Sequence, residues 1–241
     1  MSKFSLDLHH GALAAIAGSS IEVFPKETAG LVFGIIDGPK IQCVMSQPIQ
    51  DADRALHAVS WDPRVHERLK RSIMLSTGFR FLGIFHSHPY STVELTQDDS
   101  DFMKENDCAL NLIISLRPKG TDYSGPWVQD GFQVKGFVHG FEVSVGGFYL
   151  HNQKAMPTTT NYLLMDVANL LQDEFGMDLY RLSTIQDQPL VLLHYWLDKI
   201  EYHVRRDKGD YGRRKIDYAI SKIKQIIQPI ARKSSLAEAV A

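Results

Sequence analysis

Apolar residues in the first 156 positions fall into short runs, which are separated by Gly, Pro, Asp and other polar residues. Short apolar runs with such boundaries are typical of buried strands. We expect strands at Glu27–Ile36, Ile41–Pro48, Arg80–His86, Ala109–Leu116, Phe132–Val138 and Glu142–Tyr149. Helical spacing predicts helices at Ser5–Ala17, at Asp62–Ser76 and from about Thr96 onward. The pattern therefore predicts the α/β (α+β) class, with a mixed sheet flanked by helices.

From about residue 157 the apolar spacing becomes helical throughout. One helical face is formed by Leu164, Val167, Leu171 and Phe175, and a second helix is expected at Leu190–Tyr202. The most regular pattern has spacings of 4, 3, 4 and 3, at Ile216, Ile220, Ile223, Ile227 and Ile230. This isoleucine seam predicts docking onto another helix, in the same chain or in a second copy.

Two further features indicate a domain boundary near residue 157. The segment Met156–Thr160 has a turn-forming proline followed by threonines, and basic side chains outnumber acidic ones in residues 199–233. We therefore predict two parts, a first domain at residues 1–156 and an all-helical C-terminal extension at residues 157–241.

Composition and charge exclude several classes of protein. The chain has 26 basic and 28 acidic residues and a net charge of −2, which argues against a general nucleic-acid binder. In the extension the basic residues alternate with the isoleucine seam, as on a solvated helix face. The longest small-apolar run, Gly11–Gly18, is too short to span a bilayer. Two cysteines cannot form a disulfide framework, so a cytoplasmic location is expected.

The most informative segment is His86-Ser87-His88-Pro89. If His86 lies near the end of a strand, the residue two positions on projects from the same face, so both imidazoles can reach one point. Two neutral imidazoles at one point are typical ligands of zinc. Two alternate histidines on a strand are also common without any metal, so this pair alone is a weak signal.

Two acidic residues strengthen the metal hypothesis. Thr96 lies eight positions after His88, and Asp99 follows three positions later, where its carboxylate can supply an oxygen ligand. The same spacing fits a capping box, in which Thr96 is the N-cap of a helix, and the two interpretations are compatible. Upstream, Glu27 begins an apolar run in which Gly30 and Gly34 suggest tight packing. Glu is uncommon in strands, although a solvated carboxylate at the start of a strand would also explain it.

Taken together, these residues resemble the JAMM/MPN+ (JAB-domain) family of zinc metalloproteases, whose members include deubiquitinases. The family signature is a Glu, then His-(Ser/Thr)-His-Pro, and then a Ser and an Asp at the spacing of Thr96 and Asp99 here. The start of the Glu27 run, Glu-x-x-Gly-Leu-x-x-Gly, also resembles many prokaryotic members. The resemblance covers roughly residues 5–150 and implies an MPN/JAB-type mixed sheet flanked by helices.

The resemblance also implies roles for the signature residues. His86, His88 and Asp99 would bind one Zn²⁺ ion, with a water molecule in the fourth position as the nucleophile. Glu27 would be the general base, and the Thr96 hydroxyl would donate to the oxyanion. Thr96 stands where the family usually has Ser, which keeps the hydroxyl and adds a methyl group that stiffens the rotamer.

The implied reaction is hydrolysis of the amide bond after the C-terminus of ubiquitin or a ubiquitin-like protein, in deconjugation or in precursor processing. One alternative is a peptidase that processes a sulfur-carrier protein. Another is a non-catalytic scaffold, whose sequence would lack a metal ligand. The expected partners are a ubiquitin-like protein or its conjugates, together with a second copy or another protein bound through the C-terminal helices. Neither a membrane nor a nucleic acid is expected as a partner.

Overall fold

The computed structural model describes residues 4–106, 108–120, 127–163, 196–197, 199–200, 202–204 and 209–238. Contacts within the chain divide it into two units, Met1–Tyr162 and Leu163–Ala241. Each unit is described by itself below. Among the described residues, no helix is both long enough and apolar enough to cross a membrane.

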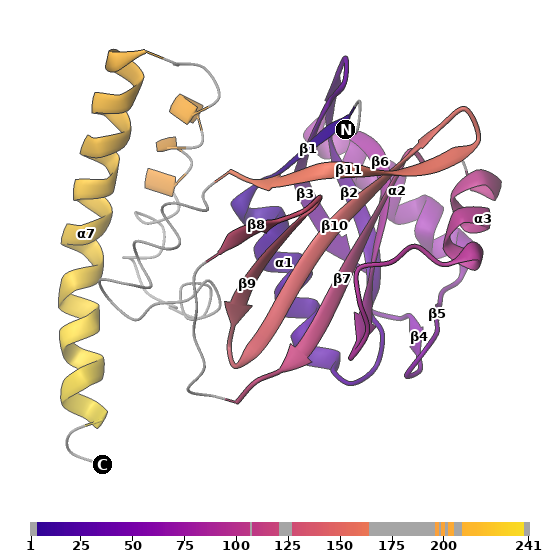
Figure 1. Ribbon diagram of the computed structural model, residues 1–241, viewed down its shortest axis with the longest axis horizontal. Coiled ribbons are helices and arrows are strands. Elements are labelled where there is room, and N and C mark those ends of the chain that lie inside the picture. Colours follow the sequence, from indigo (N-terminus) through magenta and orange to yellow (C-terminus); the bar gives the residue numbers. More distant parts are fainter. Residues whose placement is uncertain are drawn as a thin grey trace. The chain divides into compact units, whose positions relative to one another are not determined.

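The first unit is built on a nine-stranded mixed sheet (Figure 1), in the order β11-β1-β3-β2-β6-β7-β10-β9-β8. Strand β11 joins the two sides of this sheet, because its residues 154–158 pair with β10 and its residues 159–162 pair with β1. The strands are β1 (Ser5–Leu8), β2 (Ala29–Asp37), β3 (Lys40–Pro48), β6 (Arg80–Pro89), β7 (Leu110–Pro118), β8 (Val128–Asp130), β9 (Gln133–Val138), β10 (Phe141–His151) and β11 (Lys154–Tyr162). A separate small hairpin is formed by β4 (Asp53–Arg54) and β5 (Val59–Ser60).

Helices cover both faces of the sheet. Helix α1 (His10–Val23) packs on the face to which Ser46 of β3 points, since the Ser46 hydroxyl donates to the Ala12 carbonyl at 2.9 Å. The neighbouring residue Met45 points the other way. It packs in a core cluster with residues of α2 (Pro63–Thr77) and α3 (Gln97–Glu105). The predicted class, a mixed sheet flanked by helices, is confirmed.

The sequence located most of these elements correctly. Helix α2 begins at Pro63, with the Asp62 carboxylate accepting from the Arg64 N–H at 2.8 Å, and it ends at the left-handed Gly78. The predicted strands at β2, β3, β6, β7, β9 and β10 are all present. Trp127, just before β8, is 2% exposed and packs edge to face on Tyr162, so its role in the fold is packing.

The helix predicted at Ser5–Ala17 is wrong at its start. Residues Ser5–Leu8 form strand β1, and the helix begins only at His10. Leu6 and Leu8 alternate toward the core and are fully buried. The strand pairs in parallel with β3 and β11. Both partners are distant in the sequence, so the spacing of apolar residues near Ser5 could not predict this pairing.

The end of the first unit also differs from the expected boundary at residue 156. Strand β11 runs across this position to Tyr162, because its threonines alternate between the core and the surface, with Thr158 and Thr160 fully buried. The segment Met156–Thr160 is therefore part of the sheet, and the contacts divide the chain after Tyr162.

The described elements of the second unit are helical. Residues 196–197, 199–200 and 202–204 lie in or next to the predicted second helix, and α7 (Asp210–Glu238) contains the isoleucine seam. Ile223 is fully buried, and the ring of Trp196 packs edge to face on Tyr218 of α7. The helix predicted from Leu164 to Phe175 lies outside the described residues. Docking of a second copy or of another protein through these helices stays a prediction.

Candidate metal centre

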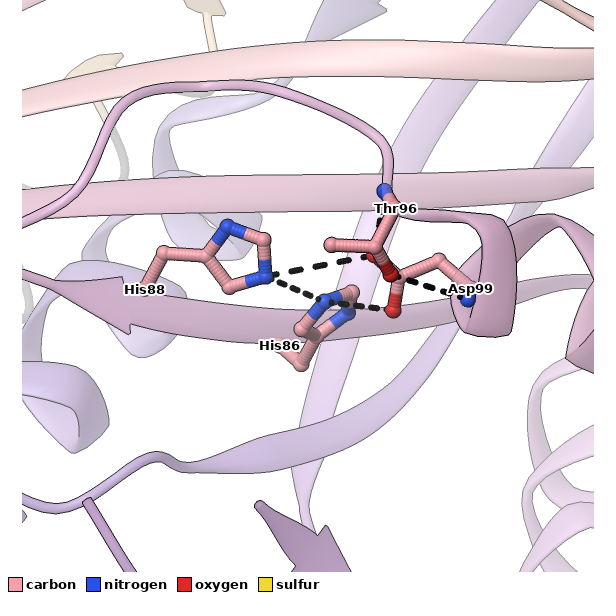
Figure 2. Close-up of polar contacts among 4 residues, drawn as sticks. All are labelled: His86, His88, Thr96 and Asp99. Carbon is pink, nitrogen blue, oxygen red and sulfur yellow. Dashed lines mark hydrogen bonds and ion pairs between the residues drawn. The ribbon is translucent and has the colours of Figure 1, made fainter. Parts of the chain in front are cut away.

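Strand β6 carries the histidine pair. His86 and His88 are two positions apart, so both side chains project from the face of the sheet that Ile84 shares. The strand lies between β2 and β7, with Ala29 and Ile113 as the register partners of His86. The two Nε2 atoms lie 2.9 Å apart (Figure 2). The predicted convergence of the two imidazoles is therefore present.

Helix α3 aims the third donor. Thr96 is the N-cap of α3, and its hydroxyl oxygen accepts from the Asp99 N–H at 3.1 Å. In return the Asp99 carboxylate accepts from the backbone N–H of Thr96 at 2.9 Å and from its hydroxyl at 2.6 Å. This capping box fixes the rotamer of Asp99. Oδ1 of Asp99 then lies 3.0 Å from His86 Nε2, and Oδ2 lies 4.0 Å from His88 Nε2.

The surroundings set the charge of these donors. Burial alone would raise the pKa of Asp99, but the hydrogen bond and charge of His86 and the hydrogen bonds from Thr96 outweigh it, and the net pKa is lowered. Burial lowers the pKa of His88, and the neighbouring His86 lowers it further. The site therefore favours an ionised carboxylate and a neutral His88 at neutral pH, which are the forms that bind a metal.

The donor set fits a divalent transition metal. One ligand atom each from His86, His88 and Asp99 lies within 4.8 Å of the others. A tetrahedral zinc ion with Zn–N bonds of ~2.0–2.1 Å needs ligand atoms about 3.3 Å apart, and the distances of 2.9, 3.0 and 4.0 Å lie on either side of this value. Two nitrogens and one oxygen suit zinc better than calcium or magnesium, which prefer oxygen ligands.

Glu27 lies in the connection just before β2, and its side chain is 9% exposed. Its backbone N–H donates to the Ala55 carbonyl at 2.8 Å. The next residue, Thr28, is tied to β6 twice: its N–H donates to the Ser87 hydroxyl at 2.9 Å, and its carbonyl accepts from the Ser87 N–H at 2.9 Å. Ser87, between the two histidines, therefore holds the Glu27 segment against strand β6.

The environment of Glu27 favours a proton. Burial raises the pKa of this carboxyl above its ordinary value, while the charge of His86 opposes the shift and that of Asp99 adds to it. A carboxylate with a raised pKa binds a proton more readily than an exposed one, which suits a general base.

All five predicted site residues line one pocket of about 660 Å³, which also contains residues that the sequence did not identify. The predicted members are Glu27, His86, His88, Thr96 and Asp99, and their catalytic and ligand roles stay predictions. The other lining residues are His57, Ala58, Val59, Trp61, Ile84, Pro89, Tyr90, Ser91, Glu94, Asp98 and Phe102. Ile84 and Phe102 could have been found from their spacing to His86 and Asp99, whereas no sequence signal marks Trp61.

The chain is similar to known JAB domains. Residues 9–124 match the family of prokaryotic homologs of the JAB domain. Among solved structures, the solution structure of protein DSY2949 from Desulfitobacterium hafniense is similar, with 19% sequence identity, a TM-score of 0.45, and coverage of 65% of this chain and 92% of that chain. No curated protein matches the chain. The match over residues 9–124 supports assignment of this part of the chain to the JAB-domain family.

Proposed function

We propose that the chain is a zinc-dependent peptidase or isopeptidase, which hydrolyses the amide bond after the C-terminus of ubiquitin or a ubiquitin-like protein. The observation that carries this proposal is the position of the His86, His88 and Asp99 donors in the same pocket as a buried carboxylate, Glu27. The JAB-domain family includes metalloproteases, which is consistent with this chemistry. Ubiquitin-like substrates are the part of the proposal that rests on family resemblance alone.

In this mechanism the residues of the chain have separate roles. His86, His88 and Asp99 would hold the ion. A bound zinc ion supplies Lewis acidity, which lowers the pKa of water and polarises a carbonyl. Glu27 accepts a proton from the attacking water and passes it to the leaving amine, and its raised pKa favours the protonated form that this transfer requires.

Thr96 has a different role in this proposal from the one that the resemblance implies. Its hydroxyl donates to the Asp99 carboxylate, with the two oxygen atoms 2.6 Å apart, and it accepts from the Asp99 N–H. A hydroxyl that is engaged in this way orients the ligand Asp99. Donation to an oxyanion would require its proton to turn away from Asp99.

The test measures metal content and cleavage on the same protein. Wild type, Glu27→Gln and a control variant, Glu22→Gln at an exposed position of α1, are purified and assayed for zinc. They are then incubated with linear and isopeptide-linked ubiquitin-like fusions, with and without a chelator. We expect one zinc ion per chain in all three proteins, and cleavage by wild type and Glu22→Gln only.

The other outcomes separate the alternatives. Cleavage of only a linear sulfur-carrier fusion would replace the deconjugating activity with precursor processing. Zinc binding without cleavage of any fusion would contradict the proposed substrate class. A lack of zinc in all three proteins after reconstitution would contradict the mechanism and favour a non-catalytic scaffold.

A further inference from the structure

The pocket that contains the metal-binding residues has an apolar wall, formed by Val59, Trp61, Ile84 and Phe102. Ile84 is part of a core cluster, and the other three pack against that cluster while remaining partly exposed. The wall is therefore a fixed extension of the core into the pocket. Partly exposed apolar side chains in a concave site are typical of ligand contacts.

Two residues of the wall, Ile84 and Phe102, lie beside the metal-binding residues because the same elements carry them. Ile84 precedes His86 by two positions on β6, a separation of about 6.6–6.8 Å on one face of a strand. Phe102 follows Asp99 by three positions on α3, a separation of about 5–6 Å on one face of a helix. An extended peptide advances ~3.3 Å per residue. If the cleaved bond of an extended substrate lies at the metal-binding residues, the substrate residue that reaches the wall is therefore about two positions from that bond.

The side chain of Trp61 is held in a fixed orientation by contacts with His66 and Phe102. Its indole Nε1 donates to Nδ1 of His66 on α2 at 3.3 Å. The Trp61 ring packs edge to face on Phe102, with centroids 5.8 Å apart, and on His66 at 6.1 Å. His66 itself packs against Phe81 at 5.7 Å. Because the only polar atom of the indole is satisfied by His66, the ring is free to offer apolar surface to the pocket.

His66 is suited to accept this hydrogen bond. Its side chain is 8% exposed, and burial together with the charge of Lys70 lowers its pKa. The lowered pKa favours a neutral imidazole, and with its proton on Nε2 this imidazole has a lone pair on Nδ1 for the Trp61 N–H.

We propose that the apolar wall of Val59, Trp61, Ile84 and Phe102 is a specificity subsite, which takes an apolar side chain of the substrate within about two residues of the cleaved amide bond, and that His66 is the positioning residue that orients Trp61. This inference rests on the proposed hydrolysis and names a feature of its substrate. Glycine has no side chain that could contact the wall. The substrate residue that contacts the wall is therefore not glycine, and it lies on one side of the cleaved bond.

The first test is substrate preference. The zinc-loaded wild-type chain is given four pairs of fluorogenic peptides, and the members of each pair differ only by Gly or Leu at one of the two residues on either side of the cleaved bond. We expect kcat/KM to be at least about 10-fold higher for Leu at one of these positions. Trp61→Ala should abolish the preference through a higher KM. Equal cleavage of Gly and Leu peptides at every position would overturn the subsite.

His66 is tested with a matched pair of variants. His66→Leu removes the acceptor for the Trp61 indole, whereas His66→Asn places an amide oxygen near the position of Nδ1. We expect His66→Leu to raise KM for the preferred Leu peptide with little change in kcat. In His66→Asn, KM should be close to the wild-type value. An equal loss in both variants, or a loss in kcat alone, would contradict the positioning role.

The second test does not depend on turnover. The chain has three tryptophans, and their indole N–H signals are followed by ¹⁵N NMR in the Glu27→Gln protein. Acetyl-Gly-Leu-amide should shift the Trp61 signal, which is assigned with Trp61→Phe, and acetyl-Gly-Gly-amide should not. A shift without cleavage of any peptide would keep the subsite and contradict the hydrolysis. No shift, or the same shift with both ligands, would overturn the subsite.

Discussion

The pocket has a polar half, with the predicted metal ligands and Glu27, and an apolar half, the wall of Val59, Trp61, Ile84 and Phe102, and two elements contribute to both halves. On β6, His86 and His88 belong to the polar half and Ile84 to the apolar half. On α3, Asp99 belongs to the polar half and Phe102 to the apolar half. Position along one strand and one helix therefore determines which chemistry each side chain contributes.

The halves also differ in what they contribute to folding. In the polar half the buried Glu27 carboxyl has a raised pKa, so its ionised form does not favour the folded state. The apolar half belongs to or packs against the core, so its burial stabilises the fold. Substitutions in the polar half should therefore affect function more than stability, and substitutions in the apolar half should affect stability more than function.

The largest expected effect is on zinc affinity, in a comparison along β6. His88→Ala should lower the affinity for zinc by more than the roughly 10–100-fold that loss of a supporting group costs, since it removes one of the three proposed ligands. Ile84→Val, four positions earlier, should leave the affinity unchanged and lower the free energy of unfolding by about 0.5–1.5 kcal/mol. Zinc titration and denaturant unfolding of both variants measure these effects. Equal zinc affinity in the two variants would contradict the separate roles of the polar and apolar halves.

The next effect is on stability, in the apolar half. Phe102→Ala should lower the free energy of unfolding of the metal-free protein by about 2–4 kcal/mol, because Phe102 packs on the core cluster and on Trp61. Asp98→Asn on the exposed side of the first turn of α3 is the control and should cost less than about 0.5 kcal/mol. Denaturant unfolding measures both. A cost for Phe102→Ala no greater than that of the control would show that the wall does not extend the core.

The sequence could predict the convergence of His86, His88 and Asp99 because their geometry is local, whereas the place of Glu27 in the site was implied by the family resemblance. The convergence of His86 and His88 follows from the two-residue period of a strand, and the position of Asp99 follows from a cap three residues away. The wall could not be predicted in the same way. Trp61 and Phe102 come together only after α2 and α3 pack on the sheet, and the contact of Trp61 with His66 is a property of the fold around them.

The same distinction explains where the predicted fold was right. Helix α2 and the central strands carry their signals within their own residues, such as Pro63 and the apolar runs. Strand β1 carries almost none, because Ser5 pairs with Thr159 of β11 and with Lys40 of β3. Strand β11 has a proline and several threonines and resembles a linker in isolation, although it completes the sheet.

A smaller effect concerns the stability of the metal-free protein at different pH values. The pKa of Glu27 is raised in the folded state, so the folded protein keeps this proton at pH values where the unfolded chain has released it. The free energy of unfolding should therefore decrease as the pH rises from the ordinary Glu pKa of about 4.5 through the higher pKa of Glu27 in the folded protein. In Glu27→Gln this decrease should be smaller, and the variant should be more stable than wild type at neutral pH.

Thermal unfolding of the two metal-free proteins at several pH values measures the difference. Glu22→Gln, at an exposed position, should follow the wild-type profile. A Glu27→Gln protein that is less stable than wild type at neutral pH would mean that the ionised carboxylate stabilises the fold, contrary to its raised pKa.

The smallest effects are expected at Thr96, where the polar half depends on a helix cap. Thr96→Ala removes the acceptor for the Asp99 N–H and the hydroxyl that holds its carboxylate, and should cost about 1 kcal/mol of stability and weaken zinc binding. Thr96→Ser keeps both hydrogen bonds and should change stability by no more than a few tenths of a kcal/mol. Unfolding and zinc titration of the pair distinguish the two roles of the hydroxyl. If Thr96→Ala binds zinc as tightly as Thr96→Ser does but cleaves far more slowly, the hydroxyl acts on the reacting substrate and not on Asp99, which would restore the oxyanion role that the family resemblance implies.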